Sequence, residues 1–358
     1  MWSGDEARNR YFQTTVTEAL LQKHGIQLRL APFNQTSEAI SKLRNERAAG
    51  KNSEGSIDAI WINGENFRTA KEAKLLWGPI TQLIPNSIFY PDWTKLRDFG
   101  TAIDGFEVPW QNSQFVIAYD EARSPSQPKS FPLLLEWAKL HPGRFTYIAP
   151  PDFTGSAFIR HLLLFYGGGA KPFQSSFDAT LYETASNQAF QFLNEIKPYL
   201  WKKGTTYPST AQELDRLFAN QEIDFTMSYA PAFASEKIAR GEFPATTRTF
   251  LFESGTLGNY NYLAIPFNAS NRKGGLTLIN ELVSYERVFD MAKVLGNGFP
   301  LALEKLNDSQ RSDVEALPRG IATLPAQERA AHLLQEPDAE YLNRLDADWR
   351  RRVLLGGE

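Results

Sequence analysis

A short apolar strand that runs directly into the start of a helix constrains this chain more than any other feature. Residues 57–67 read IDAIWINGENF, which is strand-like as far as Ile62 and helix-like after it. Open α/β sheets bind ligands where their strands end, because loops meet there and helix N-termini present N–H groups. We therefore expect a pocket lined by Trp61, Asn63, Glu65 and Asn66. The alternatives are that Trp61 is a core residue and that Asn63 and Glu65 only cap the helix.

The composition is that of an ordinary folded protein and excludes several classes of function. A chain of 358 residues has room for about two domains. Its net charge of -3 gives no basic excess that would suit nucleic acid or acidic lipid. With 0 Cys, the chain has no disulfides, thiolate nucleophiles or cysteine-ligated metal centres.

Neither a membrane span nor a signal peptide can be recognised in the sequence. No apolar run reaches the ~18 residues that a spanning helix needs. The first residues, MWSGD, lack the charged and then apolar layout of a signal peptide. Either the protein is cytoplasmic or a targeting segment has been removed.

Strand-like and helix-like patterns alternate along the chain. Strands are predicted at residues 26–30, 56–62, 114–119, 145–149, 224–228 and 260–267. Helices are predicted at residues 3–24, 37–49, 67–74, 131–139, 154–166, 179–201, 210–220, 273–297 and 338–354. This alternation predicts an α/β protein with parallel strands and helices on the sheet faces. The last helix carries charges on most faces, so we expect it to be solvated.

No arrangement of residues indicates catalysis. The His residues at 24, 141, 161 and 332 have no neighbouring Ser and Asp that would suggest a triad. Zinc-helix, nucleophile-elbow and P-loop patterns are absent, and the glycines at 167–169 follow a helix instead of a strand. We therefore predict no catalytic residue, no metal and no cofactor.

Aromatic and polar residues recur at predicted strand ends in both halves of the chain. Besides Trp61, Asn63 and Glu65, the candidates are Trp110, Gln111, Asp152, Thr154, Ser156, Tyr229, Glu253 and Tyr260. The helix start near Gly155 favours an anion or a polar oxygen, although Asp152 or Thr154 could instead be an ordinary N-cap. For Tyr229 and Tyr260 the alternative is packing between domains.

Four segments, residues 58–67, 108–120, 149–156 and 255–266, give the chain a family resemblance. Together they resemble the extracellular solute-binding proteins of ABC importers, and more narrowly their YnjB-like branch. The resemblance spans nearly the whole chain, and the first segment is its most specific part. Wider relatives bind thiamine, polyamines, iron or oxyanions.

The resemblance implies the two-lobed, type 2 periplasmic-binding-protein fold, an α/β fold. Each lobe is a mixed sheet flanked by helices, and two hinge strand crossings, at 114–119 and 260–265, join the lobes. Lobe 1 takes residues 1–117 and 262–308, and lobe 2 takes 118–261 and 309–358. The cleft positions that it marks are Ser3, Gly4, Asn63, Gly64, Glu65, Trp110, Gln111, Thr154, Gly155, Ser156 and Tyr229. Little precedes Trp2, so we expect that a leader and part of the first strand are missing.

The implied function is that of a periplasmic, monomeric receptor that performs no chemistry and delivers a small-molecule solute to a membrane permease. Acids at Glu65, Asp152 and Glu253 beside aromatic rings suit a cation or a flat heterocycle such as thiamine. The lack of Arg or Lys at these positions weighs against sulfate or phosphate. Iron is disfavoured, because iron sites in relatives use paired Tyr residues and Tyr229 has no adjacent Tyr. The alternatives are a hydrolase or transferase that uses cleft carboxylates, and a signalling receptor.

Overall fold

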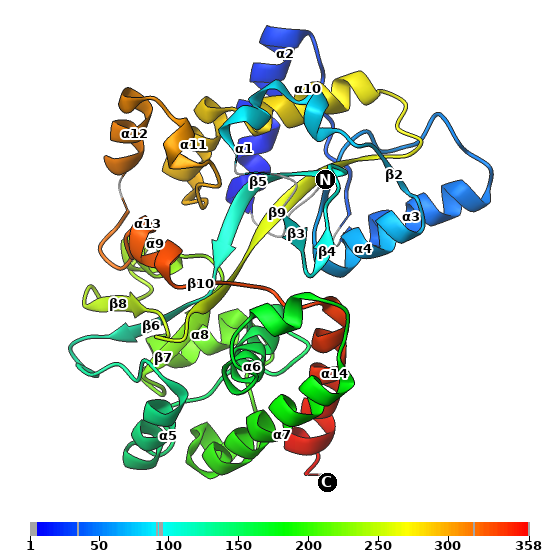
Figure 1. The fold of residues 1–358 in the computed structure, drawn as a ribbon. Coiled ribbons are helices and arrows are strands. Elements are labelled where there is room, and N and C mark those ends of the chain that lie inside the picture. The colour runs from blue at the N-terminus through cyan, green and yellow to red at the C-terminus, as the bar shows by residue number, and fades with distance from the viewer. Residues whose placement is uncertain (1–5, 34–35, 91, 93–95, 318, 357–358) are drawn as a thin grey trace. The chain divides into compact units, whose positions relative to one another are not determined.

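Strands β5 (Glu107–Gln114) and β9 (Thr256–Pro266) connect the two units into which the chain divides. The structure is a computed structural model and describes residues 6–33, 36–90, 92, 96–317 and 319–356 (Figure 1). Unit 1 is Met1–Asn112 with Tyr260–Pro318, and unit 2 is Ser113–Asn259 with Arg319–Glu358. The chain thus changes unit after residues 112, 259 and 318, where the sequence-based limits were 117, 261 and 308.

Unit 1 combines short strands with helices from both ends of its sequence. Its helices are α1 (Glu6–Tyr11), α2 (Thr17–His24), α3 (Thr36–Ala48), α4 (Gly64–Glu72), α10 (Arg272–Leu282), α11 (Tyr285–Leu295) and α12 (Asp308–Glu315). A π-helical turn, Phe12–Val16, joins α1 to α2. Besides β5 and part of β9, its strands are β1 (Ile60–Ile62), β2 (Leu76–Trp77), β3 (Arg97–Asp98) and β4 (Thr101–Ala102).

Side-chain alternation along β9 builds two apolar cores in unit 1. Leu263 and Ile265 join one cluster, which also takes Trp110 and residues of α2, α10 and α11. Tyr262 and Ala264 point to the other face and join a cluster with residues of α3 and α4. This is the two-residue period of a strand that is covered on both faces. Strand β1 pairs with β9 in the register Trp61 to Leu263, so the two faces continue across the pair.

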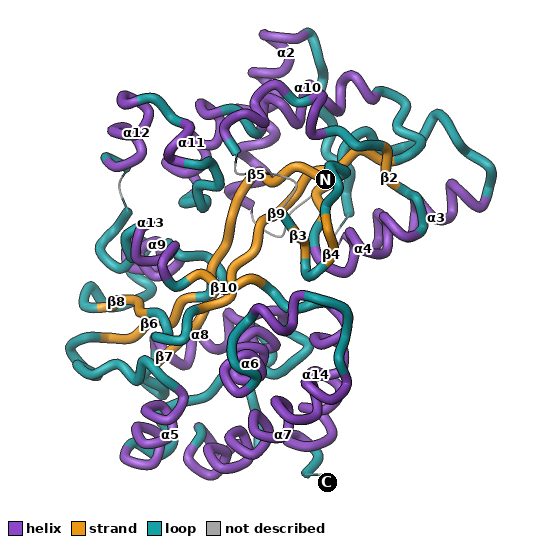
Figure 2. The backbone as a smooth tube through the Cα atoms, viewed as in Figure 1, coloured by secondary structure: helices purple, strands orange, loops and turns teal. Residues whose placement is uncertain are grey.

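Unit 2 is richer in helix and contains a small sheet. Its helices are α5 (Phe131–Leu140), α6 (Phe153–Tyr166), α7 (Ala179–Ile196), α8 (Ala211–Ala219), α9 (Phe233–Ala239), α13 (Ala326–Ala331) and α14 (Ala339–Trp349). Its strands are β6 (Val116–Asp120), β7 (Phe225–Ser228), β8 (Thr247–Phe250) and β10 (Leu333–Gln335). Strand β6 lies between β7 and β8, and helices surround this sheet (Figure 2).

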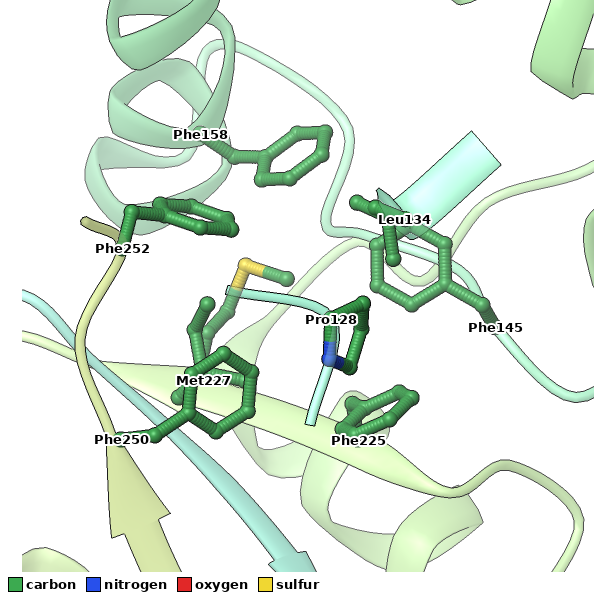
Figure 3. A pocket seen from close by; sticks show the side chains of 9 residues that line it. Pro128, Leu134, Phe145, Phe158, Phe225, Met227, Phe250 and Phe252 are labelled. Atoms are coloured by element: carbon green, nitrogen blue, oxygen red, sulfur yellow. The ribbon is translucent and has the colours of Figure 1, made fainter. Parts of the chain in front are cut away.

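An aromatic core fills unit 2 and contains a small void. Phe158, Phe225, Met227 and Phe252 are among the side chains around a cavity of about 10 Å³ (Figure 3). All of the residues that line this void are apolar. A cavity that is so small and has no polar wall stays dry, so it is a packing defect of the core and not a ligand site.

The prediction of parallel strands was wrong for most of the described pairs. Strands β1 and β2 both run antiparallel to β9, and β6 runs antiparallel to β7 and β8. Only β10 pairs with β9 in parallel among the ladders that the structure describes. Alternating helix and strand patterns predict where strands occur. These patterns do not reveal that the partner of β1 lies about 200 residues later in the sequence and runs antiparallel to it.

Two further segments were predicted as strands but form none. Residues 26–30 alternate between half-buried and exposed side chains, as a strand would, and Ile26, Leu28 and Leu30 pack on the unit 1 core. Residues 145–149 are mostly buried and make single backbone hydrogen bonds to Trp201 and Pro208. Both segments are extended, yet neither finds a ladder partner among the described residues.

Helix α14 packs on the core of unit 2. The prediction from its charges, that this helix is solvated, was therefore wrong. Tyr341, Leu345 and Trp349 recur every four residues on one face and are buried in the unit 2 core. The Trp349 indole N–H donates to the Tyr147 hydroxyl at 3.0 Å. The apolar stripe is narrow, so the charges on its flanks hid it in the sequence.

Candidate functional site

A cluster of amide and indole groups forms where β1 ends in unit 1. The Trp61 Nε1–H and the Asn63 Nδ2–H both donate to Asn261 Oδ1, each at 3.2 Å. The register that sets Ile62 opposite Tyr262 brings Asn63 beside Asn261. We call Arg8, Trp61, Asn63, Trp110 and Asn261 the Trp61 cluster.

Helix α4 begins immediately after this cluster but is not capped by it. The Gly64 N–H donates to the Asp98 carboxylate from β3, and the Asn63 side chain makes no capping hydrogen bond. Gly64 has φ +57°, a conformation that side-chain-bearing residues rarely adopt. The Asn63 side chain is therefore held by Asn261 instead of serving as the N-cap. Glu65 lies in the first turn of α4 and is exposed.

Aromatic rings and a guanidinium group complete the Trp61 cluster. Trp110 is fully buried and packs edge-on between Trp61 and Phe12, with ring centroids 5.0 and 5.8 Å away. The Arg8 guanidinium lies 5.4 Å from the centre of the half-buried Trp61 ring and donates to Asn297 Oδ1 at 3.0 Å. Arg8 does not lie at one of the predicted strand ends, and it reaches Trp61 from helix α1.

In unit 2, the start of α6 is closed by its own N-cap. Asp152 Oδ1 accepts the N–H groups of Thr154 and Gly155 at 2.9 and 3.1 Å, which is the ordinary capping arrangement. Gly155 is required because a Cβ there would lie 2.1 Å from the Ile148 carbonyl oxygen. Phe153, between these residues, is 42% exposed. The cap satisfies the N–H groups that an anion would otherwise bind.

A buried ion pair lies behind Phe153. Arg160 holds Glu336 through two nitrogens, Nε to Oε2 at 2.9 Å and Nη2 to Oε1 at 3.3 Å. The same guanidinium donates to Ser156 Oγ at 3.0 Å and to the Tyr229 hydroxyl at 3.2 Å. The Tyr229 hydroxyl also donates to Glu336. We call Phe153, Ser156, Arg160, Tyr229 and Glu336 the Arg160 cluster.

Charge pairing in this cluster outweighs the cost of burial. Burial alone would lower the pKa of Arg160, but the acidic Glu336 and the Tyr229 hydroxyl hold it above its ordinary value. Burial, together with Glu336, raises the pKa of Tyr229 well above that of a free tyrosine. Arg160 therefore stays charged and Tyr229 stays protonated at any physiological pH. The cluster is a fixed scaffold and not a proton-transfer device.

The residue that follows Arg160 in α6, His161, makes unit 2 sensitive to acid. Its Nε2 accepts the Leu257 N–H at 2.7 Å, so its Nδ1 carries the proton and donates to the Ala157 carbonyl at 2.7 Å. Burial lowers the pKa of His161 from 6.5 to about 3. Because the unfolded chain takes up this proton first, stability falls as the pH drops from 6.5 toward 3.

Lowering the pH from 7 to 4 is expected to reduce the free energy of unfolding by ~3 kcal/mol, because of His161. Urea titrations of the wild type and of His161→Gln at both values measure it. The variant should lose less stability than the wild type over this interval. Equal losses in the two proteins would show that His161 is not the group responsible.

The structure brings together some of the predicted site residues and separates others. Trp61, Asn63 and Trp110 meet in unit 1, and Asp152, Thr154, Gly155, Ser156 and Tyr229 meet in unit 2. Gln111 is buried, Tyr260 is half-buried beside Tyr262, and Glu253 is exposed, with its N–H donating to the Lys129 carbonyl. Ser3 and Gly4 lie outside the described residues.

Sequence reasoning missed five members of the two clusters, namely Arg8, Phe153, Arg160, Asn261 and Glu336. A local signal existed for Arg160, since it follows Ser156 by four residues and so shares its helix face. No local signal points to Glu336, which is 176 residues from Arg160, or to Asn261, which is 198 from Asn63.

The described residues form neither a metal site nor a membrane span. Among them, no three His, Asp or Glu side chains gather closely enough to hold a metal ion. Likewise, none of the described helices has the length and apolar character needed to cross a membrane.

Comparison with known proteins identifies the family. Residues 15–317 match the family described as bacterial extracellular solute-binding protein. Protein YnjB of Escherichia coli strain K12 is 32% identical over 354 residues, which cover 98% of this chain and 89% of that protein. The length of the alignment and its coverage show that the two proteins are related along nearly the whole chain.

Solved structures share the fold at lower sequence identity. The spermidine/putrescine ABC transporter substrate-binding protein PotD of Streptococcus pneumoniae superposes with a TM-score of 0.66 at 14% identity, covering 94% of each chain. The structure of a GABA receptor gives a TM-score of 0.65 at 18% identity, covering 98% of this chain and 95% of that one. The fold is therefore the two-lobed α/β fold of periplasmic binding proteins. The chain belongs to the bacterial extracellular solute-binding proteins, as a substrate-binding protein of ABC importers of the YnjB-like type and not an enzyme.

Proposed function

We propose that this receptor captures a small organic solute with a cationic or flat heterocyclic group, as in thiamine, and delivers it to a membrane permease. In this proposal the two units are lobes that close on the solute, and the Trp61 and Arg160 clusters supply its contacts. We further propose that the protein acts in the periplasm as a monomer. Its membership of an extracellular family supports this location.

The observation that carries the proposal is the exposed aromatic ring of Phe153. Its ring centroid lies 4.7 Å from that of Tyr229, and its face lies 5.1 Å from the Arg160 guanidinium. Neighbours that are themselves locked by hydrogen bonds thus fix the ring, yet it remains 42% exposed. A rigid, exposed ring offers stacking area at little cost in conformational entropy.

Two further observations agree with an amine or a heterocycle. Glu65 follows the Trp61 cluster in the first turn of α4 and is exposed, so it is available to a positive group. Among proteins with this fold, some carry names that refer to spermidine/putrescine or to GABA, all of which are amines.

A thermal-shift screen tests the proposal. The panel contains thiamine and its phosphates, polyamines, amino acids, sugars and oxyanions, and an organic amine or heterocycle is expected to raise the melting temperature. Stabilisation by inorganic oxyanions alone would contradict the proposed solute class.

Replacing Phe153 by Ala then tests the site. Affinity for the stabilising compound should fall roughly tenfold, because one stacked ring is lost. The matched control is Leu133→Ala, which removes a side chain of similar exposure, 46%, from the first turn of another helix in unit 2. If both variants bind like the wild type, Phe153 does not contact the solute.

A further inference from the structure

Strand β5 carries an acidic side chain into the interior of unit 1. Val108 and Trp110 belong to the core cluster on one face of this strand, so Glu107 points to the opposite face. Strand β9 pairs with β5, and its Tyr262 packs on that opposite face, toward α3 and α4. Glu107 is 0% exposed, and neither of its side-chain oxygens has a hydrogen-bond partner within the described part of the chain. A negative charge in this position would be costly.

The charged and titratable groups around Glu107 favour its neutral form. They come from three neighbouring elements and are Asp98 of β3, Lys71 of α4 and Tyr262 of β9. Lys71 is engaged elsewhere, since its Nζ forms an ion pair with the exposed Asp104 at 2.5 Å. Burial, followed by the negative Asp98, raises the pKa of Glu107 well above its ordinary value, and Lys71 opposes them only in part. At neutral pH Glu107 is therefore an acid with a proton to donate.

Asp98 anchors the start of α4. Its carboxylate accepts the Gly64 N–H, and the side chain is 2% exposed. The Tyr262 hydroxyl donates to the Arg97 carbonyl at 3.4 Å, which holds this face of β9 against β3. A carboxylate at the N-terminus of a helix is stabilised by the helix dipole. Of the two acids, Asp98 is therefore the better place for the negative charge and Glu107 for the proton.

We propose that Glu107 is a positioning residue, which donates its proton in a hydrogen bond to the Asp98 carboxylate and so keeps that carboxylate in place to hold the Gly64 N–H. The start of α4 is then fixed between Asn63 and Glu65, the neighbours of Gly64 in the sequence and two of the proposed solute contacts. This inference rests on the proposed function, because it concerns the support of the same solute site. Glu107 acts through Asp98 and does not touch the solute.

The protonation state of Glu107 is tested by infrared difference spectroscopy. Wild-type protein at pH 7 should show the carbonyl band of a buried neutral carboxylic acid, and Glu107→Gln should lack it. Urea denaturation gives a second readout. The unfolded chain loses this proton first, as the pH rises through the ordinary value of 4.5, so the Gln variant should gain stability relative to the wild type between pH 4.5 and pH 7. His161 is present in both proteins, so its titration cancels.

Glu281 provides the matched control, because it is a buried acid of unit 1 that has cations beside it. Burial alone would raise the pKa of Glu281, but hydrogen bonds from Arg287 and Lys23 and their charges lower it. Glu281→Gln should therefore be less stable than the wild type at pH 7, the opposite sign to Glu107→Gln. The same sign in both variants would contradict the neutral state of Glu107.

Two substitutions separate the donor from the volume of the side chain. Glu107→Gln keeps an N–H donor toward Asp98, whereas Glu107→Leu has a similar volume and no donor. Exchange of the Gly64 amide proton, followed by NMR on protein labelled at glycine, should be about tenfold faster in the Leu variant and unchanged in the Gln variant. Affinity for the stabilising compound of the screen should fall in the Leu variant alone. A purely structural role would be filled by Leu as well as by Gln.

The possible failures are distinguishable. A carboxylate band for Glu107 in the wild type would overturn the inference, and so would equal Gly64 exchange in all three proteins. Unchanged affinity in a Leu variant with fast Gly64 exchange would overturn the link to the solute. The spectra and the exchange rates need no solute, so a screen without any organic ligand counts against the proposed function alone. If the Leu variant does not fold, Glu107→Met replaces it in the same comparison.

Discussion

Replacing Arg160 by Met is expected to lower the free energy of unfolding by about 3 to 5 kcal/mol. Arg160 is 0% exposed and Glu336 is 5% exposed, so the substitution leaves an acidic side chain buried without its cation. The Tyr229 hydroxyl still donates to Glu336, but one neutral donor does not replace a bidentate guanidinium. Urea denaturation monitored by tryptophan fluorescence measures the change.

A double variant separates the charge from the packing. Arg160→Met with Glu336→Gln removes both charges and keeps an acceptor for Tyr229, so most of the lost stability should return. The control is Arg344→Met, because the Arg344–Glu340 pair has side chains 52% and 40% exposed and should contribute at most ~1 kcal/mol. If the single Arg160 variant loses no more stability than the control, the buried pair does not hold unit 2 together.

Replacing Trp110 by Ala is expected to cost about 3 to 5 kcal/mol of unfolding free energy, the range for deleting a large buried aromatic side chain. Trp110 is 0% exposed and packs against Phe12 and Trp61 within the core of unit 1. Its loss leaves a cavity, and the backbone has little freedom to close it because β5, which carries Trp110, is paired with β9.

The same experiment decides how Trp110 relates to the solute. If Trp110 stacked directly on the solute, removing it would weaken binding with little loss of ligand-free stability. If it is a core residue, removing it lowers the stability first. Full burial predicts the second result, in which Trp110 would affect solute binding only by supporting Trp61. Trp77→Ala is the control, since Trp77 is half-buried and should cost less. A stable Trp110 variant with abolished ligand binding would contradict the core assignment.

Features encoded by neighbouring residues could be predicted from the sequence. Helix α8 was predicted over residues 210–220 and is observed at Ala211–Ala219, with the Thr210 side chain as its N-cap. Helix α6 likewise begins where its Asp152 cap predicts. The cap, the apolar stripe and the end of a helix are all set by residues that lie close together in the sequence, so the local sequence is enough to predict them.

Features that depend on distant partners could not be predicted. Residues 26–30 have the alternation of a strand, but whether they form one depends on a partner that the local pattern does not specify. The residues of the candidate site show the same difference between local and distant signals. Trp61, Asn63 and Tyr229 stood out by type and position, whereas Asn261 and Glu336, which hold them, were recognisable only once the chain was folded.

The assignment of residues 319–358 to unit 2 has a consequence for how the chain folds as it is made. Glu336 follows Arg160 by 176 residues, and Trp349 follows Tyr147 by 202. At a synthesis rate of roughly 5 to 20 residues per second, Arg160 waits about 10 to 35 s for its acidic partner to be translated. Unit 2 therefore cannot complete its core before residues 336 and 349 have been made.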